Sequence, residues 1–216
     1  MGRLKVGVLI SGRGSNLQAL LDACASPGFP AEVVVVIANI GDAYGLERAR
    51  RAGVATQIID HRAFPGRDAF DAALDQALAA AGVELVCLAG FMRLLTPVFA
   101  NAWRGRLVNI HPSLLPSFKG LHTHRQALAA GVRLHGCSVH FVTPELDGGP
   151  IIAQAAVPVL PGDDEERLAA RVLAAEHRLY PLVLRLLGEG RVTIDGRRVT
   201  VAAGADADAM LLNPAG

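Results

Sequence analysis

Three patterns are scarce or missing in this 216-residue chain, and each absence excludes a class of protein. The three cysteines, Cys24, Cys87 and Cys137, are too few and too widely spaced for a disulfide framework or a CxxC zinc site, so we expect them to be reduced. No uncharged apolar run approaches the ~20 residues that a membrane-spanning helix needs. The formal net charge is only +1, so the overall charge predicts no polyanionic partner. We therefore expect a cytoplasmic protein that acts on small molecules, with no nucleic-acid or membrane partner.

The composition fits one globular domain with a sizeable core, since 51% of the residues are hydrophobic and 19% are charged. Short apolar runs rich in β-branched residues, typical of buried parallel strands, alternate with segments at helical spacing. This alternation predicts an α/β fold, a mostly parallel twisted sheet with helices on both faces. The expected strands are residues 5–10, 32–38, 56–59 and 84–89 with a fifth that ends at His111, and the expected helices are 17–21, 45–50 and 68–81.

The second half of the chain predicts a different arrangement. Residues 112–120 contain two prolines four positions apart, which excludes regular structure, and their hydrophobicity favours a packed loop. After a short helix at 123–130, two strands at 135–142 and 151–159 are expected to pair antiparallel. The sheet should therefore gain antiparallel strands late in the chain.

A long helix with Asp163 as its N-cap is expected next, and Pro181 should kink or interrupt it. Residues 192–201 predict a hairpin, and the Ala/Asp-rich tail beyond it is expected to be poorly ordered. We assign residues 1–190 to one domain. Residues 191–216, the hairpin and tail, are either part of that domain or partly disordered.

The glycine-rich segment between the first strand and the first helix is a candidate phosphate site. Gly14 lets the backbone turn sharply, and a helix that starts near Ser15 and Asn16 offers free N–H groups and a positive dipole to an anion. A dinucleotide fingerprint would need glycine in place of Leu17 and an acidic residue in place of Asn39, so the segment favours a single phosphate. An ordinary tight turn between a strand and a helix is the alternative.

Asn109 and His111 lie two residues apart at the end of the fifth strand, where side chains at i and i+2 point to the same side. An amide NH2 stabilises a developing oxyanion, and an imidazole carries a proton at neutral pH. Asp147, in a glycine-rich loop between the two late strands, would orient or charge His111. The alternatives are a backbone cap for Asn109, packing of His111 against Pro112, and a turn in which Asp147 bonds its own backbone. Because no GxSxG motif and no neighbouring cysteine is present, we expect direct transfer without a covalent enzyme intermediate.

Glu176 lies close to the apolar stripe of the long helix, where a carboxylate needs a partner. That partner is either a structural one or the hydroxyl groups of a substrate. His122 and His124 lack a third ligand at helical spacing, so the sequence predicts no metal site.

Several of these segments lie in runs that resemble the glycinamide ribonucleotide formyltransferase family, the folate-dependent formyltransferases of purine synthesis. The likeness extends in order from about residue 5 to about residue 190. The Asn-x-His-Pro-Ser-Leu-Leu-Pro run marks the wider formyltransferase superfamily, whereas Gly-x-Gly-Ser-Asn and Leu-His-Thr-His point to this member. The matching runs are residues 9–17, 42–49, 88–95, 109–116, 120–124, 138–142 and 145–151.

The resemblance implies a Rossmann-like formyltransferase fold and two substrates, 10-formyltetrahydrofolate and glycinamide ribonucleotide. It also implies roles for individual residues by their place in the motifs. The matching residues are Gly14, Ser15, Asn16 and Glu176 for the ribonucleotide phosphate and ribose, Arg67, Met92, Arg93, Leu94, Leu95 and Asn109 for folate, and Asn109, His111 and Asp147 for catalysis.

The implied chemistry is attack of the neutral glycinamide amine on the formyl carbon carried by N10 of the folate. Asn109 and protonated His111 would stabilise the oxyanion, and Asp147 would favour the charged imidazole and help to relay the amine proton. No metal and no ATP is needed. The alternatives are a formyltetrahydrofolate hydrolase with the same three residues, or a non-catalytic folate- or phosphate-binding protein. The sequence leaves open monomer or homodimer, and whether the Leu115-Pro116 bond is cis.

Overall fold

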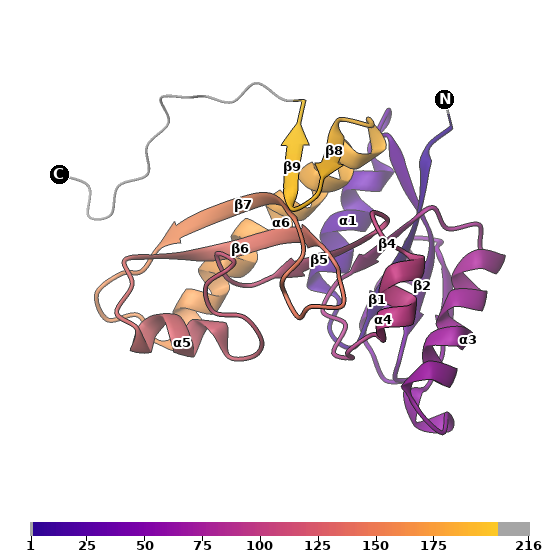
Figure 1. Cartoon of the computed structure of the whole chain (residues 1–216), viewed down its shortest axis with the longest axis horizontal. Helices are drawn as coiled ribbons and strands as arrows, with labels where there is room; N and C mark the ends of the chain where they lie inside the picture. Colours follow the sequence, from indigo (N-terminus) through magenta and orange to yellow (C-terminus); the bar gives the residue numbers. More distant parts are fainter. Residues whose placement is uncertain (1, 203–216) are drawn as a thin grey trace.

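A sheet of seven strands runs through the part of the chain that the structure describes, residues 2–202 (Figure 1). In this computed structural model the strand order is β3-β2-β1-β4-β5-β6-β7. β1 to β5 are parallel to one another, whereas β6 is antiparallel to both β5 and β7. The strands are β1 (Leu4–Ile10), β2 (Ala31–Ala38), β3 (Ala55–Ile58), β4 (Leu85–Leu88), β5 (Leu107–His111), β6 (Leu134–Phe141) and β7 (Ile151–Pro158).

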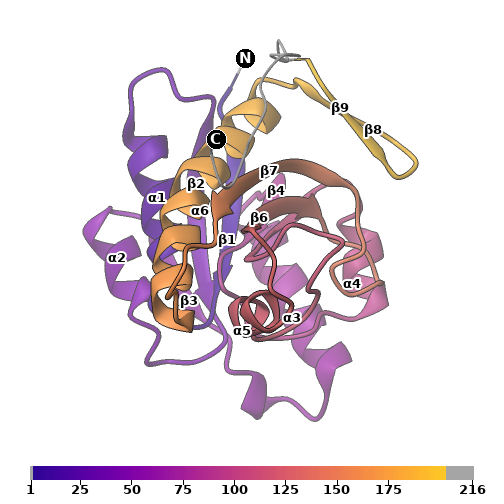
Figure 2. The same ribbon diagram turned by 90° about the vertical axis from the view of Figure 1, so that its left-hand side faces the viewer.

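Helices cover both faces of the sheet, and each face has its own apolar core (Figure 2). Because successive side chains of a strand point to opposite faces, Val8 and Leu9 of β1 belong to different cores. One core lies beneath α1, α2 and α6, and the other lies beneath α3 and α4. The helices are α1 (Ser15–Ala25), α2 (Gly45–Arg51), η1 (His61–Ala63, a 3-10 turn), α3 (Arg67–Ala80), α4 (Pro97–Ala102), α5 (Thr123–Ala129) and α6 (Glu165–Gly188).

The order of strands along the sheet reverses at β1, which lies between β2 and β4. Ligands of open parallel sheets bind beyond the carboxyl ends of the strands at such a point. Tyr180 of α6, fully buried, joins two neighbouring strands here, since its hydroxyl lies 3.1 Å from the carbonyl oxygen of Leu88 and 3.3 Å from that of Val108. Tyr180 thus joins β4 to β5, and β1 lies on the other side of β4.

The predicted fold class is confirmed, and most element bounds agree with the prediction within two residues. The predicted hairpin is also present, as β8 (Val192–Asp195) paired with β9 (Arg198–Val201), and it packs against β7. The prediction for the tail falls on residues 203–216, outside the described residues. The loop after β5 is packed as expected, with the Leu115-Pro116 bond in the cis form. None of the helices described is long and apolar enough to cross a membrane.

Two details of α6 differ from the prediction. Its N-cap is Asp164, whose carboxylate accepts the backbone N–H of Arg167, while Asp163 instead pairs with Arg171 at 2.8 Å. Pro181 does not interrupt the helix, and the alternative outcome, a kink at Pro181, stays a prediction. Burial explains this, because apolar side chains before and after the proline pack into one core, and several such side chains outweigh the ~3 kcal/mol that an internal proline costs.

Helix α4 was not predicted, although its start carries a clear sequence pattern. Thr96 caps it by accepting the backbone N–H of Phe99 at 3.3 Å, and Pro97 occupies the first turn, where a missing N–H costs nothing. Six residues are too few to show an apolar period, which is why helical spacing did not reveal it.

Candidate active site

The segment after β1 forms a turn that only glycine fits. Gly14 has a left-handed backbone, with φ of 70° and ψ of 35°, and a Cβ there would lie 2.7 Å from the Cα of Gly45. Helix α1 begins directly after it at Ser15, with no acidic side chain in its first turn. The free N–H groups of α1 therefore form an electropositive end, as the sequence predicted for a phosphate site.

Asn16 and Glu176, 160 residues apart in the chain, meet behind this turn. The Nδ2 of Asn16 donates to the Oε2 of Glu176 at 2.6 Å, and both side chains are buried. Burial raises the pKa of the Glu176 carboxyl, and the hydrogen bond from Asn16 opposes that rise. The Oδ1 of Asn16 is buried and has no hydrogen-bond partner among the described residues. We name residues 14–16 together with Glu176 the phosphate end of the site.

Ser11 joins the loops that follow β1, β2 and β4. Its hydroxyl donates to the Oδ1 of Asn39 at 2.6 Å and accepts the backbone N–H of Met92 at 2.8 Å. The segment after β4 is thereby fixed at the same edge of the sheet as the phosphate end. Met92 and Leu94 are 69% and 60% exposed, so this segment presents apolar surface that a flat organic ligand would cover.

Arg67, the first residue of α3, lies near the same segment. One turn further along the helix, Phe70 stacks on Phe91 with 6.4 Å between ring centroids, and Asp71 accepts the backbone N–H of Thr96 at 2.6 Å. The guanidinium of Arg67 forms no hydrogen bond or ion pair with the residues that the structure describes. These contacts of Phe70 and Asp71 fix the segment after β4, which includes Arg93 and Leu95. Leu95 is partly buried against the core beneath α3.

The side chain of Asn109 is oriented by a buried histidine on the neighbouring strand. Asn109 of β5 pairs with His140 of β6, and its Nδ2 lies 3.3 Å from the Nε2 of His140. The Nδ1 of His140 lies 2.9 Å from the carbonyl oxygen of Phe141, which can only accept, so Nδ1 carries the hydrogen. Burial lowers the pKa of His140, which keeps the ring neutral and leaves Nε2 as an acceptor. Asn109 therefore directs its NH2 group toward His140 and has its second N–H to offer elsewhere.

His111 lies between a backbone carbonyl and a carboxylate. Its Nε2 is 3.0 Å from the carbonyl oxygen of Phe118 and so carries a hydrogen, while its Nδ1 is 3.6 Å from the Oδ2 of Asp147. Asp147 has a left-handed φ of 47°, and Gly120 donates its backbone N–H to the same Oδ2 at 2.9 Å. The Nδ1 of His111 therefore faces a carboxylate oxygen. We name Asn109, His111, His140 and Asp147 the reaction end.

Comparison with known proteins shows the family to which the chain belongs. The Formyl transferase family matches residues 4–184. The chain belongs to this family. A phosphoribosylglycinamide formyltransferase of Escherichia coli is 51% identical over 203 residues, which cover 91% of this chain and 96% of that protein. The trifunctional purine biosynthetic protein adenosine-3 of Drosophila pseudoobscura pseudoobscura is 54% identical over 190 residues, and the chain spans 87% of its own length but only 14% of that protein.

Solved structures of the family share the fold. The glycinamide ribonucleotide transformylase 1 of Symbiobacterium toebii has a TM-score of 0.90 and 58% identity, covering 92% of this chain and 94% of that one. The phosphoribosylglycinamide formyltransferase of Coxiella burnetii, in complex with CHES, has a TM-score of 0.88 and 46% identity, covering 92% and 93%. The seven-stranded sheet and its crossovers are therefore those of the formyl transferase family.

Sequence reasoning missed three groups of the reaction end: the imidazole of His140, the carbonyl of Phe118 and the backbone N–H of Gly120. His140 could have been found from the alternating pattern of the strand at 135–142, which places Ser138 and His140 on one side. The register that sets His140 opposite Asn109 is not visible in that pattern. The two backbone groups leave no trace in the residue types.

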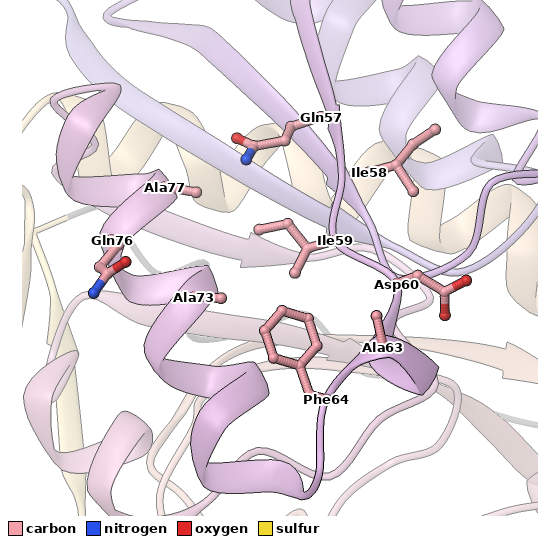
Figure 3. Close-up of a pocket in the computed structure, with 9 residues that line it drawn as sticks. All are labelled: Gln57, Ile58, Ile59, Asp60, Ala63, Phe64, Ala73, Gln76 and Ala77. Atoms are coloured by element: carbon pink, nitrogen blue, oxygen red, sulfur yellow. The ribbon is translucent and has the colours of Figure 1, made fainter.

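A hollow of about 630 Å³ lies elsewhere, between β3, η1 and α3 (Figure 3). It is lined by mostly apolar groups and holds none of the residues predicted for the site. A second hollow, of about 580 Å³, lies beside Ser15 and includes Arg48 and His177. The lining of the first hollow includes Gln57, Ile59, Asp60, Phe64, Ala73 and Ala77.

Among the described residues, no three or more His, Cys, Asp or Glu side chains are grouped so that they could hold a metal ion. His124, one of the two histidines considered above, instead lies with its Nδ1 3.2 Å from the Nε2 of His135. That the reaction needs no metal stays a prediction.

Proposed function

We propose that this formyl transferase moves the formyl group of 10-formyltetrahydrofolate to the amine of glycinamide ribonucleotide, a step of purine biosynthesis. One observation carries the proposal: an amide, a histidine and a carboxylate converge at the end of β5, at the same edge of the sheet as the N-terminus of α1. The names of the relatives support the choice of substrates, since those that the chain matches over nearly their full length are phosphoribosylglycinamide formyltransferases.

The phosphate end would hold the ribonucleotide. Residues Gly14, Ser15 and Asn16 would bind its phosphate through backbone N–H groups at the start of α1, and Glu176 would accept hydrogen bonds from the ribose hydroxyls. The segment after β4 would bind the folate, with backbone groups reading the pterin and Arg67 pairing with an acidic part of the molecule. The folate-binding residues are Arg67, Met92, Arg93, Leu94, Leu95 and Asn109.

The reaction then follows from the groups at the reaction end. The amine nitrogen forms a bond to the formyl carbon, the carbonyl electron pair moves to oxygen, and the free N–H of Asn109 with the charged His111 stabilises that oxyanion. The separation of 3.6 Å between His111 and Asp147 is longer than a direct hydrogen bond, so we infer that a water bridges them. Through it the proton of the attacking amine passes to N10 as the carbon–N10 bond breaks, and the oxyanion returns to a carbonyl. No covalent enzyme intermediate is needed.

Release of tetrahydrofolate tests the proposal. The protein is incubated with 10-formyltetrahydrofolate with and without glycinamide ribonucleotide, and tetrahydrofolate is measured in both. Release only in the presence of the ribonucleotide is the expected result. Release without it would indicate a formyltetrahydrofolate hydrolase, and no release in either case would favour a non-catalytic binding protein.

Three further expectations remain predictions. The protein is a monomer or a homodimer, it acts in the cytoplasm, and residues 1–190 form the catalytic domain to which the β8–β9 hairpin is attached. Size measurement in solution and expression of residues 1–190 alone would test the first and the last.

A further inference from the structure

The reaction end depends on two backbone groups that belong to the loop between β5 and α5. The carbonyl oxygen of Phe118 accepts from His111, and the backbone N–H of Gly120 donates to Asp147. Phe118 and Gly120 both have left-handed backbones, with φ of 54° and 78°, so this part of the loop turns sharply. Neither group lies on a strand, and the two flank a single residue, Lys119.

Lys119 ties this loop to the loop that carries Asp147. Its Nζ donates to the Oε1 of Glu145 at 2.9 Å, although Lys119 and Glu145 are 35% and 56% exposed. Glu145 in turn accepts the backbone N–H of Gly148 at 3.2 Å through its carbonyl, which closes the turn around Asp147. Among the described residues, the bond between Lys119 and Glu145 is the side chain–side chain hydrogen bond that joins the two loops.

A third segment reaches the same carboxylate from the end of the chain. Arg197, in the turn between β8 and β9, has its Nη2 3.3 Å from the carbonyl oxygen of Gly148 and its Nη1 3.8 Å from the Oε2 of Glu145. The hairpin is held in place because Val192, Val199 and Val201 pack against the core beneath α6. These residues follow residue 184, where the match to the family ends.

The electrostatics of the cluster agree with the geometry. The hydrogen bond from Lys119, aided by the charge of Arg197, lowers the pKa of the Glu145 carboxyl. Each oxygen of Glu145 faces a different cation, so the carboxylate links the loop after β5, the loop before β7 and the C-terminal hairpin. An exposed ion pair stabilises a fold only weakly, so its effect should be local.

We propose that Glu145 is a positioning residue for the transfer reaction, acting through Lys119 and Arg197. It keeps the carbonyl of Phe118 and the N–H of Gly120 against His111 and Asp147, and so raises the fraction of molecules with an assembled reaction end. This inference rests on the proposed function. It assigns a role to the C-terminal hairpin, which lies beyond the family match.

Steady-state kinetics of Glu145→Gln and Lys119→Met tests this role. We expect kcat to fall roughly 3- to 5-fold in each variant, with KM for the ribonucleotide unchanged, because an exposed pair changes a local equilibrium by about that factor. The double variant should be no slower than the slower single variant, since Glu145→Gln already removes the interaction that Lys119→Met removes. Lys119→Arg should keep the wild-type kcat because it can still pair with the carboxylate.

The matched control is Glu32→Gln, which breaks an equally exposed ion pair with Arg3 at 3.8 Å on the amino-terminal side of the sheet. It should leave kcat unchanged, and all variants should keep the wild-type Tm within about 2 °C. If the wild type is active and Glu145→Gln lowers kcat by less than about 1.5-fold, this inference is wrong but the proposed function stands. A loss matched by Glu32→Gln, or additive losses in the double variant, would do the same. A wild type without transfer activity would overturn the proposed function and this inference with it.

Discussion

The phosphate end and the reaction end are built in different ways, although they lie at the same edge of one sheet. The phosphate end uses three consecutive residues, 14–16, at the junction of β1 and α1, with one distant partner in Glu176. The reaction end collects Asn109 and His111 from β5, His140 from β6 and Asp147 from a loop, and two backbone groups complete it. In the proposed function, binding therefore depends on a local turn, whereas catalysis depends on strand register and loop packing.

This difference predicts a division of labour that substitutions can separate. Changes at the reaction end should lower kcat and spare the binding of the ribonucleotide. Changes at the phosphate end should weaken that binding or alter stability. The substitutions below are ordered by the size of the expected effect.

Asn109→Ala should have the largest effect, a fall in kcat of about 10²–10³-fold, because it removes an oxyanion donor. Steady-state assays with both substrates measure it. Asn101→Ala, which removes an exposed amide of α4 that bonds Arg104, is the control and should behave as wild type. Near-full activity of Asn109→Ala would show that the assigned role is wrong.

Asp147→Asn should lower kcat roughly 100-fold, the order of a lost proton-transfer partner. The amide oxygen can still accept the N–H of Gly120, so the loop keeps its shape and only the charge facing His111 is lost. The assay is the same, with circular dichroism to verify the fold. If kcat changed less than about twofold, the carboxylate charge would have no part in proton transfer.

His140→Phe should lower kcat about 10-fold. Phenylalanine keeps a ring in the same place but removes the nitrogen acceptor that orients Asn109, a loss of roughly 1 kcal/mol or somewhat more. KM for the ribonucleotide should stay unchanged. If Asn109→Ala and the double variant with His140→Phe have equal kcat, the histidine acts through Asn109. Additive losses would contradict that coupling.

Glu176→Gln should stabilise the free protein by about 1 kcal/mol near pH 8, because it removes a buried charge and keeps an acceptor for Asn16. Burial raises the folded pKa of this carboxyl, so wild-type stability is reduced above that pKa and recovers as the pH falls below it. The advantage of the variant should therefore shrink toward acid pH. Thermal unfolding at several pH values measures it, and a lower Tm near pH 8 would identify the carboxylate as structural.

The same contrast explains what the sequence could predict. The parallel strands, the turn at Gly14 and the pair Asn109 and His111 were predictable because each depends on near neighbours in the chain. The register of β6 against β5, which brings His140 to Asn109, depends on packing across the sheet and was not. Likewise Phe118 and Gly120 contribute backbone groups, which residue types do not encode.

The ends of α6 and the start of α4 show how local patterns compete with tertiary packing. Asp163 and Asp164 are equally good caps by type, and the ion pair of Asp163 with Arg171 leaves Asp164 as the cap. Pro181 is a helix breaker by type, yet the apolar side chains around it are buried in one core. Thr96 and Pro97 carried the pattern of a helix start that spacing alone did not reveal.

Calorimetric binding of glycinamide ribonucleotide to the Asn109→Ala variant tests the division of labour most directly. The phosphate end is intact in that variant, so we predict a Kd within about twofold of wild type, although kcat falls about 10²–10³-fold. A loss of ribonucleotide affinity as large as the loss of kcat would contradict the account, because it would show that Asn109 binds the ribonucleotide instead of stabilising the transition state.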